Sequence, residues 1–394
     1  MADSGMKVLE NPRSYRPDPI RVLHCSQPVD GGTATVLQHL AEADLQKGRS
    51  VTIASPPGRL SRWAAEHGVP WIRLSLSREP RAADLWAVYK LRKLLRSVDL
   101  VFLHSSKAGA VGRLGMATLP RIQRPKCAFF PHAWSWYAGG HVGRLYRLFE
   151  SLAAHWCDAI IAVSRGEELD GLACLFPSAA RKLLLIENGI DVDAYTPSGE
   201  AAIRTSDPLI VCVGRLCKQK GQDDLIRSMS LLKDSTATLY LIGDGPDASD
   251  LRVLAQRLGV AHRVRFVGMT DPRPYFRAAD IVAIPSRWEG LSLVLLEAMA
   301  CGATVLATPM AAGSLSNDAA IITTAGAEPA RFAEQITRLL ADPESRRRHA
   351  RRARTLVERR YSLQRATNEY HVLVDSLFQI DFRADPAGLW ENTA

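Results

Sequence analysis

Short apolar runs alternate along the chain with longer segments whose apolar residues recur every three or four positions. The runs predict buried strands, and the segments between them predict amphipathic helices, such as "TATVLQHLAEADLQKG" from Thr33. The first half holds the runs "RVLHCS", "SVTIAS", "PWIRLSL", "DLVFLHS", "KCAFFPH", "AIIAVS" and "KLLLIENG", and the second holds "LIVCVG", "ATLYLIGDG", "VRFVGM", "DIVAIPS" and "ATVLAT". This alternation is typical of parallel sheets covered by helices.

Because the pattern occurs twice, we predict an α/β protein of two doubly wound, Rossmann-like domains that face each other across a cleft. The polar, small segment 197–207, with Pro197 and Gly199, is the predicted linker. We expect a flexible extension over 1–19, an N-terminal domain over 20–196, a C-terminal domain over 208–375, and a tail over 376–394 that could cross back to the N-terminal domain.

Composition limits the compartment, the cysteine chemistry and the partners that we expect for this protein. No apolar run is long enough to span a bilayer and no signal-peptide core precedes residue 20, so we expect a cytoplasmic protein. The seven cysteines form no C-x-x-C pair, which predicts reduced thiols and no zinc site. Much of the net charge of +9 lies in 344–362, where a solvated helix face is favoured over a docking surface. Aromatic residues are not interleaved there, so nucleic acid is not an expected partner.

Three corners that follow predicted strands carry candidate chemistry, because ligands of such sheets bind beyond the strand ends. In "GRLCKQKG", Gly214 turns the chain and Arg215 and Lys220 could bind a diphosphate, although two ordinary surface cations fit equally well. In "QPVDGGTATV", Gly31 and Gly32 let the backbone approach a ligand.

The third corner lies in "PSRWEGLSLVLLEAMACG", at residues 285–302. Ser292 is the predicted N-cap, so the amides of residues 293–295 would face an anion, and Gly302 would end the helix. Glu297 lies one turn into this apolar helix and Glu289 precedes it. Each could accept hydrogen bonds from neutral hydroxyls, and a nucleotide sugar carries hydroxylated rings on both sides of its phosphates.

These segments, together with "FFPHAW" around His132, "HSSKAGAVGRL" from His104, "AVS" at Ser164 and "ENGIDVDAY" from Glu187, resemble the retaining glycosyltransferases of family 4. The similarity extends from Ile20 to beyond Tyr361. It implies the GT-B fold, with the acceptor bound by the N-terminal domain and the nucleotide sugar by the C-terminal domain.

The resemblance also implies roles for individual residues. Arg215, Lys220, Glu289 and His132 would be catalytic: the two cations on the donor diphosphate, Glu289 and His132 beside the donor sugar. Glu297 would bind the ribose. The remaining donor-binding residues are Gly31, Gly32, Gly214, Met269, Gly290, Leu291, Ser292 and Leu293. The chain departs from the family pattern at "LSL" after Gly290 and at "TPMAAGSLSNDAAIIT".

The acceptor side is less specific. His104, Trp134, Trp136 and Tyr137 are candidate acceptor residues, because aromatic faces over a cleft suit a sugar ring or an aglycone. A hydrophobic lid that packs on its own domain fits this loop equally well. The helix predicted in 81–97 carries leucines and basic residues that could lie on an anionic membrane, although a core-packed helix is favoured.

Two further motifs point elsewhere. "GDGPDA" from Gly243 matches a dinucleotide pattern, but Asp244, Asp247 and Asp250 would repel a pyrophosphate. The pair Asp191 and Asp193 could bind a metal, but a solvated turn fits better.

We therefore expect a metal-independent, retaining hexosyltransferase with no cofactor. Its partners would be a nucleotide diphosphate sugar, such as a UDP-sugar, and a hydroxyl acceptor that is a glycan, a lipid-linked glycan or a small natural product. A peripheral membrane contact on the cytoplasmic face is an open addition. The alternatives are a nucleotide-sugar epimerase or hydrolase of the same fold, and a non-catalytic binding protein.

Overall fold

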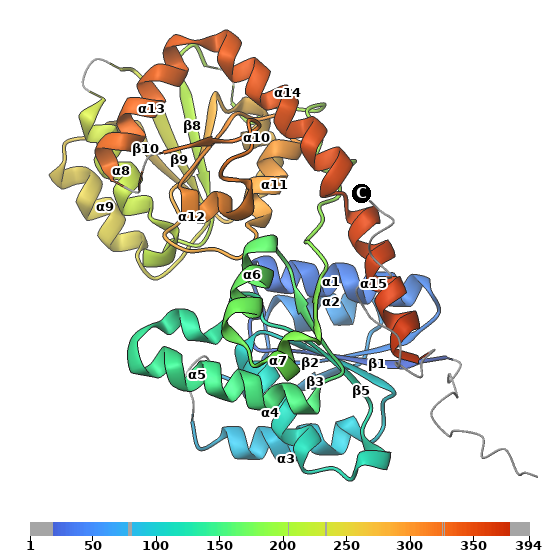
Figure 1. Ribbon diagram of the computed structural model, residues 1–394. Helices are drawn as coiled ribbons and strands as arrows, with labels where there is room; N and C mark the ends of the chain where they lie inside the picture. Colours follow the sequence, from blue (N-terminus) through green and yellow to red (C-terminus); the bar gives the residue numbers. More distant parts are fainter. Residues whose placement is uncertain are drawn as a thin grey trace, which may run out of the picture.

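The computed structural model describes residues 19–77, 81–203, 205–232, 235–324, 326 and 328–378. Within them the chain forms two α/β domains, each with a parallel sheet covered by helices (Figure 1). The predicted fold class is confirmed. The expected extension over 1–19 lies almost entirely outside the described residues, as does the end of the tail beyond 378.

The N-terminal domain has a seven-stranded sheet in the order β3-β2-β1-β4-β5-β6-β7. Its strands are β1 (Arg21–Ser26), β2 (Ser50–Ser55), β3 (Trp71–Arg73), β4 (Leu100–His104), β5 (Lys126–Phe130), β6 (Ala159–Ala162) and β7 (Leu183–Leu185). Its helices are α1 (Gly31–Gln46), α2 (Arg59–Glu66), α3 (Asp84–Leu95), α4 (Ser106–Ala117), α5 (Gly140–Ala153), α6 (Arg165–Cys174) and α7 (Pro177–Ala180). Strands β1, β4 and β5 are neighbours, so their carboxyl ends meet at one edge.

The C-terminal domain has a six-stranded sheet in the order β10-β9-β8-β11-β12-β13. Its strands are β8 (Leu209–Val213), β9 (Thr238–Ile242), β10 (Val264–Gly268), β11 (Ile281–Ile284), β12 (Val305–Ala307) and β13 (Ile322–Thr323). Its helices are α8 (Gln222–Leu231), α9 (Ala248–Arg257), α10 (Arg273–Ala278), α11 (Leu293–Ala300), α12 (Pro309–Ala312), α13 (Pro329–Ala341) and α14 (Pro343–Arg360).

The last described helix, α15 (Leu363–Phe378), follows α14 directly and returns to the N-terminal domain (Figure 1). The Tyr370 ring lies 5.1 Å from the ring of Phe102 in β4, and the Tyr370 hydroxyl bonds to Asp44 of α1. Residues 363–375 therefore pack on the N-terminal domain, and the predicted boundary at 375 is too late. The sequence pattern of an amphipathic helix shows that one face is apolar, but it does not show which domain that face packs against.

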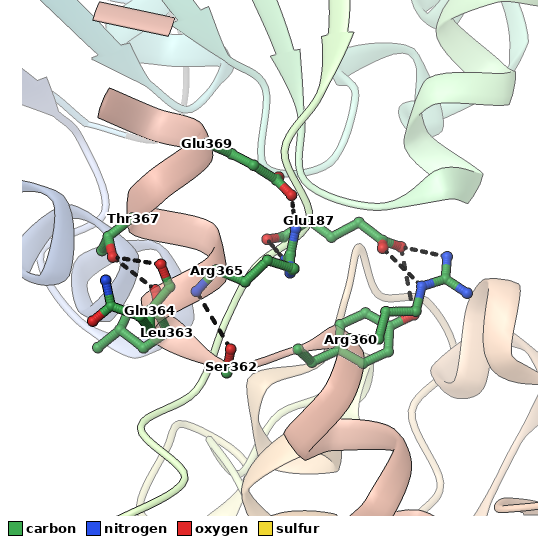
Figure 2. A network of polar contacts seen from close by, with 9 residues as sticks. Glu187, Arg360, Ser362, Leu363, Gln364, Arg365, Thr367 and Glu369 are labelled. Carbon is green, nitrogen blue, oxygen red and sulfur yellow. Dashed lines mark hydrogen bonds and ion pairs between the residues drawn. The ribbon is translucent and has the colours of Figure 1, made fainter. Parts of the chain in front are cut away.

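The two connections between the domains run side by side. Ile190 and Ser362 form a parallel bridge, in which the Ile190 amide donates to the Tyr361 carbonyl at 2.8 Å. A Cβ at Gly189 would lie 2.6 Å from the Ser362 carbonyl oxygen, so only glycine allows this approach. Figure 2 shows the Glu187 carboxylate facing Arg360, while the Glu187 carbonyl accepts a hydrogen bond from Arg365. The crossing between the domains thus lies at Ile190, before the linker predicted at 197–207, whose Ala202 amide donates to the Pro274 carbonyl of the C-terminal domain.

No helix in the described ranges is long and apolar enough to cross a membrane. The basic helix α14 is mainly solvated, but some of its arginines are structural. Arg354 donates to the carbonyls of Val192, Tyr195 and Ala300, which joins α14 to the connection and to α11.

Candidate active site

The start of α11 offers a row of free backbone amides. Within the described residues, the N–H groups of 290–294 donate to no protein acceptor, and the helix hydrogen bonds begin at Leu295. Ser292 occupies the N-cap position, but its hydroxyl makes no capping bond and is buried without a partner. The predicted set of free amides is therefore displaced toward the chain start, because the Leu295 amide donates to the Ser292 carbonyl at 3.1 Å. Such a row can bind an anion.

Two cations lie in the corner after β8. Arg215 is exposed, and within the described chain its guanidinium has no protein partner. Lys220 forms an ion pair with Glu289, and both side chains are largely buried. Gly221 has a φ of +67°, and a Cβ there would lie 2.2 Å from the Pro285 carbonyl oxygen. The close approach holds this corner against the end of β11, which leads to the free amides.

Glu297 is the buried carboxylate of α11, 9 % exposed. Burial raises its pKa to about 7, while a hydrogen bond from Tyr195 and the charges of Arg59 and Lys220 act in the opposite direction. Because Arg59 belongs to the N-terminal domain and Tyr195 to the connection, this carboxylate lies where the two domains meet. Tyr195 is thus a hydrogen-bond partner of this buried carboxylate.

The glycine pair of the N-terminal domain faces α11. A Cβ at Gly32 would lie 3.6 Å from Cδ1 of Leu293, an ordinary contact distance. Gly31 has a φ of +71°, a conformation that favours glycine, and begins helix α1 two residues before the predicted Thr33. The pair therefore lies beside the free amides, as a donor site between the domains requires.

His132 lies in a strained loop after β5. Its φ is +49° and that of Ala133 is +88°, which is unusual for residues other than glycine. The loop is held by Glu167 of α6, whose carboxylate accepts from the Ala133 amide at 2.7 Å and from the Val163 amide at 2.8 Å. Burial raises the pKa of Glu167 to about 7 against the effect of these bonds. Strain maintained by a buried carboxylate is typical of a functional position.

Several predicted acceptor residues are unsuited to bind a ligand directly. Trp134 is buried, and its indole N–H donates to the Glu167 carbonyl at 2.8 Å. Trp136 stacks on Trp134 with ring centroids 4.2 Å apart, and His104 is fully buried. Tyr137 is exposed but its hydroxyl bonds to Asp170. His104 and Trp134 thus expose almost no surface to a ligand, and the loop packs on its own domain, as in the alternative interpretation; their acceptor role stays a prediction.

The other motifs have structural explanations. Cβ atoms at Gly243 and Gly245 would lie 2.2 Å from the carbonyl oxygens of Gly214 and Leu216, so these glycines let two strand-end loops pack closely. Asp191 accepts from the amides of Asp193 and Ala194 and therefore closes a turn. Met269, predicted at the donor site, is 80 % exposed after β10.

Comparison with known proteins agrees with this geometry. Residues 30–194 match the model of "Glycosyltransferase Family 4", and residues 207–342 match that of "Glycosyl transferases group 1". The two matches together cover most of both domains and all the residues of the predicted donor site. The chain belongs to the group 1, family 4 glycosyltransferases.

Individual relatives of this glycosyltransferase differ in name. A D-inositol 3-phosphate glycosyltransferase of Xylanimonas cellulosilytica is 33 % identical over 51 % of this chain and 53 % of its own length. The chain spans about half the length of the first curated relatives it matches. Anabaena HepE in complex with UDP-glucose, at 21 % identity and a TM-score of 0.77, covers 91 % of this chain and 100 % of its own, and has the same GT-B fold.

Three residues near this glycosyltransferase site were not predicted: Tyr195, Arg59 and Glu167. Tyr195 stands in the quoted segment "ENGIDVDAY", but nothing in the sequence pairs it with Glu297. Arg59 is the first residue of α2 and Glu167 lies in the first turn of α6, and no local sequence pattern distinguishes either. Only the tertiary fold brings them to the site.

Proposed function

We propose that this glycosyltransferase transfers a hexosyl group from a nucleotide diphosphate sugar to a hydroxyl, with retention of the anomeric configuration and without a metal ion. The observation that carries the proposal is the free amide row at 290–294 beside Arg215 and Lys220. Amides and cations that converge beyond two strand ends suit a diphosphate better than any neutral ligand.

The chemistry follows from where charge develops. The bond from the anomeric carbon to the β-phosphate oxygen breaks, and Arg215, Lys220 and the amides stabilise the negative charge on the leaving diphosphate. The acceptor oxygen bonds to the anomeric carbon from the face that the phosphate leaves, and its proton passes to a phosphate oxygen. Two fixed cations supply charge that a metal would otherwise supply, so activity should persist in excess EDTA.

Glu289 and Glu297 serve as hydroxyl acceptors in this proposal. Glu289 is oriented by Lys220 and would bind the transferred sugar, and Glu297 would bind the ribose. A carboxylate that accepts two hydrogen bonds from a vicinal diol discriminates strongly against ligands that lack them.

The test is a thermal-shift panel of nucleotide sugars followed by product analysis. A donor that binds the folded state raises the melting temperature, and the chosen donor is then incubated with and without hydroxyl acceptors. Transfer with retained anomeric configuration in NMR supports the proposal. Full donor turnover without an acceptor would instead establish the epimerase or hydrolase alternative.

A second observation supports acceptors held at a membrane surface. One face of α5 exposes Val142, Leu145, Leu148 and Leu152, each at least 45 % accessible, with Arg144 and Arg147 exposed beside them. In the predicted 81–97 helix, Leu91 and Leu95 are buried, but Leu85 and Trp86 are exposed. Apolar residues flanked by arginines suit an anionic lipid surface.

Vesicle co-sedimentation tests this membrane contact. The wild type should bind vesicles that contain anionic phospholipid, and L145Q/L148Q should lose most of that binding. Arg351→Gln/Arg352→Gln on α14 is the matched control and should bind normally. Equal binding by the α5 variant and the wild type would remove α5 as the contact.

A further inference from the structure

Three histidines form a continuous hydrogen-bonded chain below the candidate site. His24 lies in β1, His104 ends β4, and His132 follows β5, so the three come from neighbouring strands. Nδ1 of His24 lies 3.1 Å from Nε2 of His104, and Nδ1 of His104 lies 3.1 Å from Nε2 of His132. His24 and His104 are fully buried, and successive rings stack at 5.4 Å.

The inner end of the chain is a buried carboxylate, Asp44 of α1. Its Oδ1 accepts from Nη1 of Arg49 at 2.7 Å. Its Oδ2 lies 2.9 Å from Nε2 of His24 and accepts from the Tyr370 hydroxyl at 2.7 Å. A guanidinium donates only, and a carboxylate paired with it accepts only. His24 must therefore donate its Nε2 proton to Asp44.

This donor sets the direction of every later bond when His24 carries one proton, whereas a doubly protonated His24 would donate from Nδ1 as well and reverse both later bonds. In neutral His24, Nδ1 is an acceptor, so His104 donates from Nε2 and accepts at Nδ1. His132 in turn donates from Nε2, which leaves its own Nδ1 unprotonated and able to accept a hydrogen bond. Burial lowers the pKa of His104 well below its usual value and that of His132 to about 3, which keeps both rings neutral. No protein atom in the described residues bonds to Nδ1 of His132.

We propose that Asp44, His24 and His104 are positioning residues that hold His132 as its Nε2–H tautomer, so that Nδ1 accepts a hydrogen bond from a hydroxyl of the donor sugar. The acceptor role rests on the proposed function, whereas the tautomer belongs to the ligand-free protein. Since Tyr370 lies in α15, the returning helix also contributes to this orientation. The opposite tautomer would present N–H to the same hydroxyl and require it to accept instead.

Asp44→Asn should reverse the donor–acceptor direction of each hydrogen bond that links His24, His104 and His132. Arg49 can only donate, so it holds the oxygen of the introduced amide and turns the amide N–H₂ toward His24. His24 then accepts at Nε2, and each following bond changes direction, which makes His132 the Nδ1–H tautomer. Asp99→Asn is the matched control, because Asp99 is a carboxylate that pairs with Arg21 and takes no part in the hydrogen bonds of the three histidines.

Nitrogen-15 NMR of histidine-labelled protein measures the tautomers directly, with the His132 signals assigned from His132→Gln. We expect Nε2–H in the wild type and in Asp99→Asn, and Nδ1–H in Asp44→Asn. An Nδ1–H tautomer in the wild type, or an unchanged His132 tautomer in folded Asp44→Asn, would overturn the proposal.

His24→Phe covers the case in which Asp44→Asn does not fold. It keeps a ring beside Phe102 but removes both nitrogens, so His104 and His132 should lose their single tautomer. A single Nε2–H tautomer at His132 in this variant would contradict the positioning role of Asp44 and His24. In transfer assays, Asp44→Asn should lower kcat/KM for the donor about tenfold, as expected for one mismatched buried hydrogen bond. Because the NMR result needs no substrate, its failure is distinguishable from a failure of the proposed function.

Discussion

The two sheet edges that face each other at the candidate site are built in opposite ways. The C-terminal edge presents groups that have no partner among the described residues, namely the amides of 290–294 and the exposed Arg215. The N-terminal edge is filled, with His24, His104 and Trp134 buried and hydrogen-bonded behind His132. One edge therefore offers hydrogen-bond donors to an anion, whereas at the other edge a buried row of hydrogen-bonded side chains ends at the His132 ring.

The largest expected effect lies on the C-terminal edge. Arg215→Ala and Lys220→Ala should each lower kcat/KM by about 100- to 1,000-fold, since under the proposed function each removes a donor that stabilises the leaving diphosphate. Steady-state transfer assays measure the loss. Lys218→Ala, in the same corner but exposed, is the control and should stay near the wild type. Near-normal rates in the first two variants would remove the diphosphate assignment.

Glu297→Gln tests the buried carboxylate of that edge through pH. The pKa of Glu297 is raised to about 7 from 4.5, so the folded state keeps a proton that the unfolded state releases. Wild-type stability should therefore fall as pH rises from about 4.5 to 7, by up to ~3 kcal/mol from this group. The variant lacks this loss, so calorimetry should find it more stable than the wild type at pH 8 and similar near pH 4.5.

The same variant should weaken the donor. In the proposed function Glu297 accepts hydrogen bonds from the ribose, so its loss should raise the KM for the donor about tenfold. Glu66→Gln, at an exposed position of α2, is the control for both measurements. A stability difference independent of pH would show that Glu297 does not titrate with a raised pKa.

On the N-terminal edge, Glu167→Ala should cost about 2 kcal/mol of unfolding free energy, because it leaves the amides of Val163 and Ala133 without their acceptor. Urea unfolding measures this loss. Glu168→Ala is the neighbouring control, since Glu168 pairs on the surface with Arg165. If the two variants were equally stable, Glu167 would not be what holds the His132 loop.

The smallest effect is expected between the edges, at the connection. Arg360 is 48 % exposed where it pairs with Glu187, so Arg360→Ala should cost below about 1 kcal/mol in urea unfolding and leave donor binding unchanged (Figure 2). A loss of several kcal/mol would indicate that this pair, and not the Ile190–Ser362 bridge, holds the two connections together.

The difference between the edges also explains what the sequence could predict. The predicted strands all form, because buried parallel strands leave long apolar runs. β13 (Ile322–Thr323) was not predicted, since two residues make no pattern. The charged corner of Arg215, Lys220 and Glu289 follows strands directly, so local position placed these charges at the carboxyl edge of the sheet, while their donor-binding roles stay a prediction that came from the family resemblance.

The N-terminal edge could not be predicted in the same way. A tryptophan in a glycine-bearing loop fits both a lid and a binding surface, and only the bond from Trp134 to Glu167 decides between them. His24 is one polar residue in a buried strand, whose partners lie 20 and 80 positions away. Hydrogen-bond direction is a property of the assembled fold, and no local pattern carries it.

The return of α15 has a consequence for how the molecule is made. The N-terminal domain emerges from the ribosome first. Tyr370, which bonds to Asp44 of that domain, is synthesised only after the C-terminal domain. During translation the apolar surface of the N-terminal domain that α15 covers stays exposed to solvent until α15 has been synthesised. The N-terminal domain therefore completes its packing only after α15, the last described helix, has been synthesised.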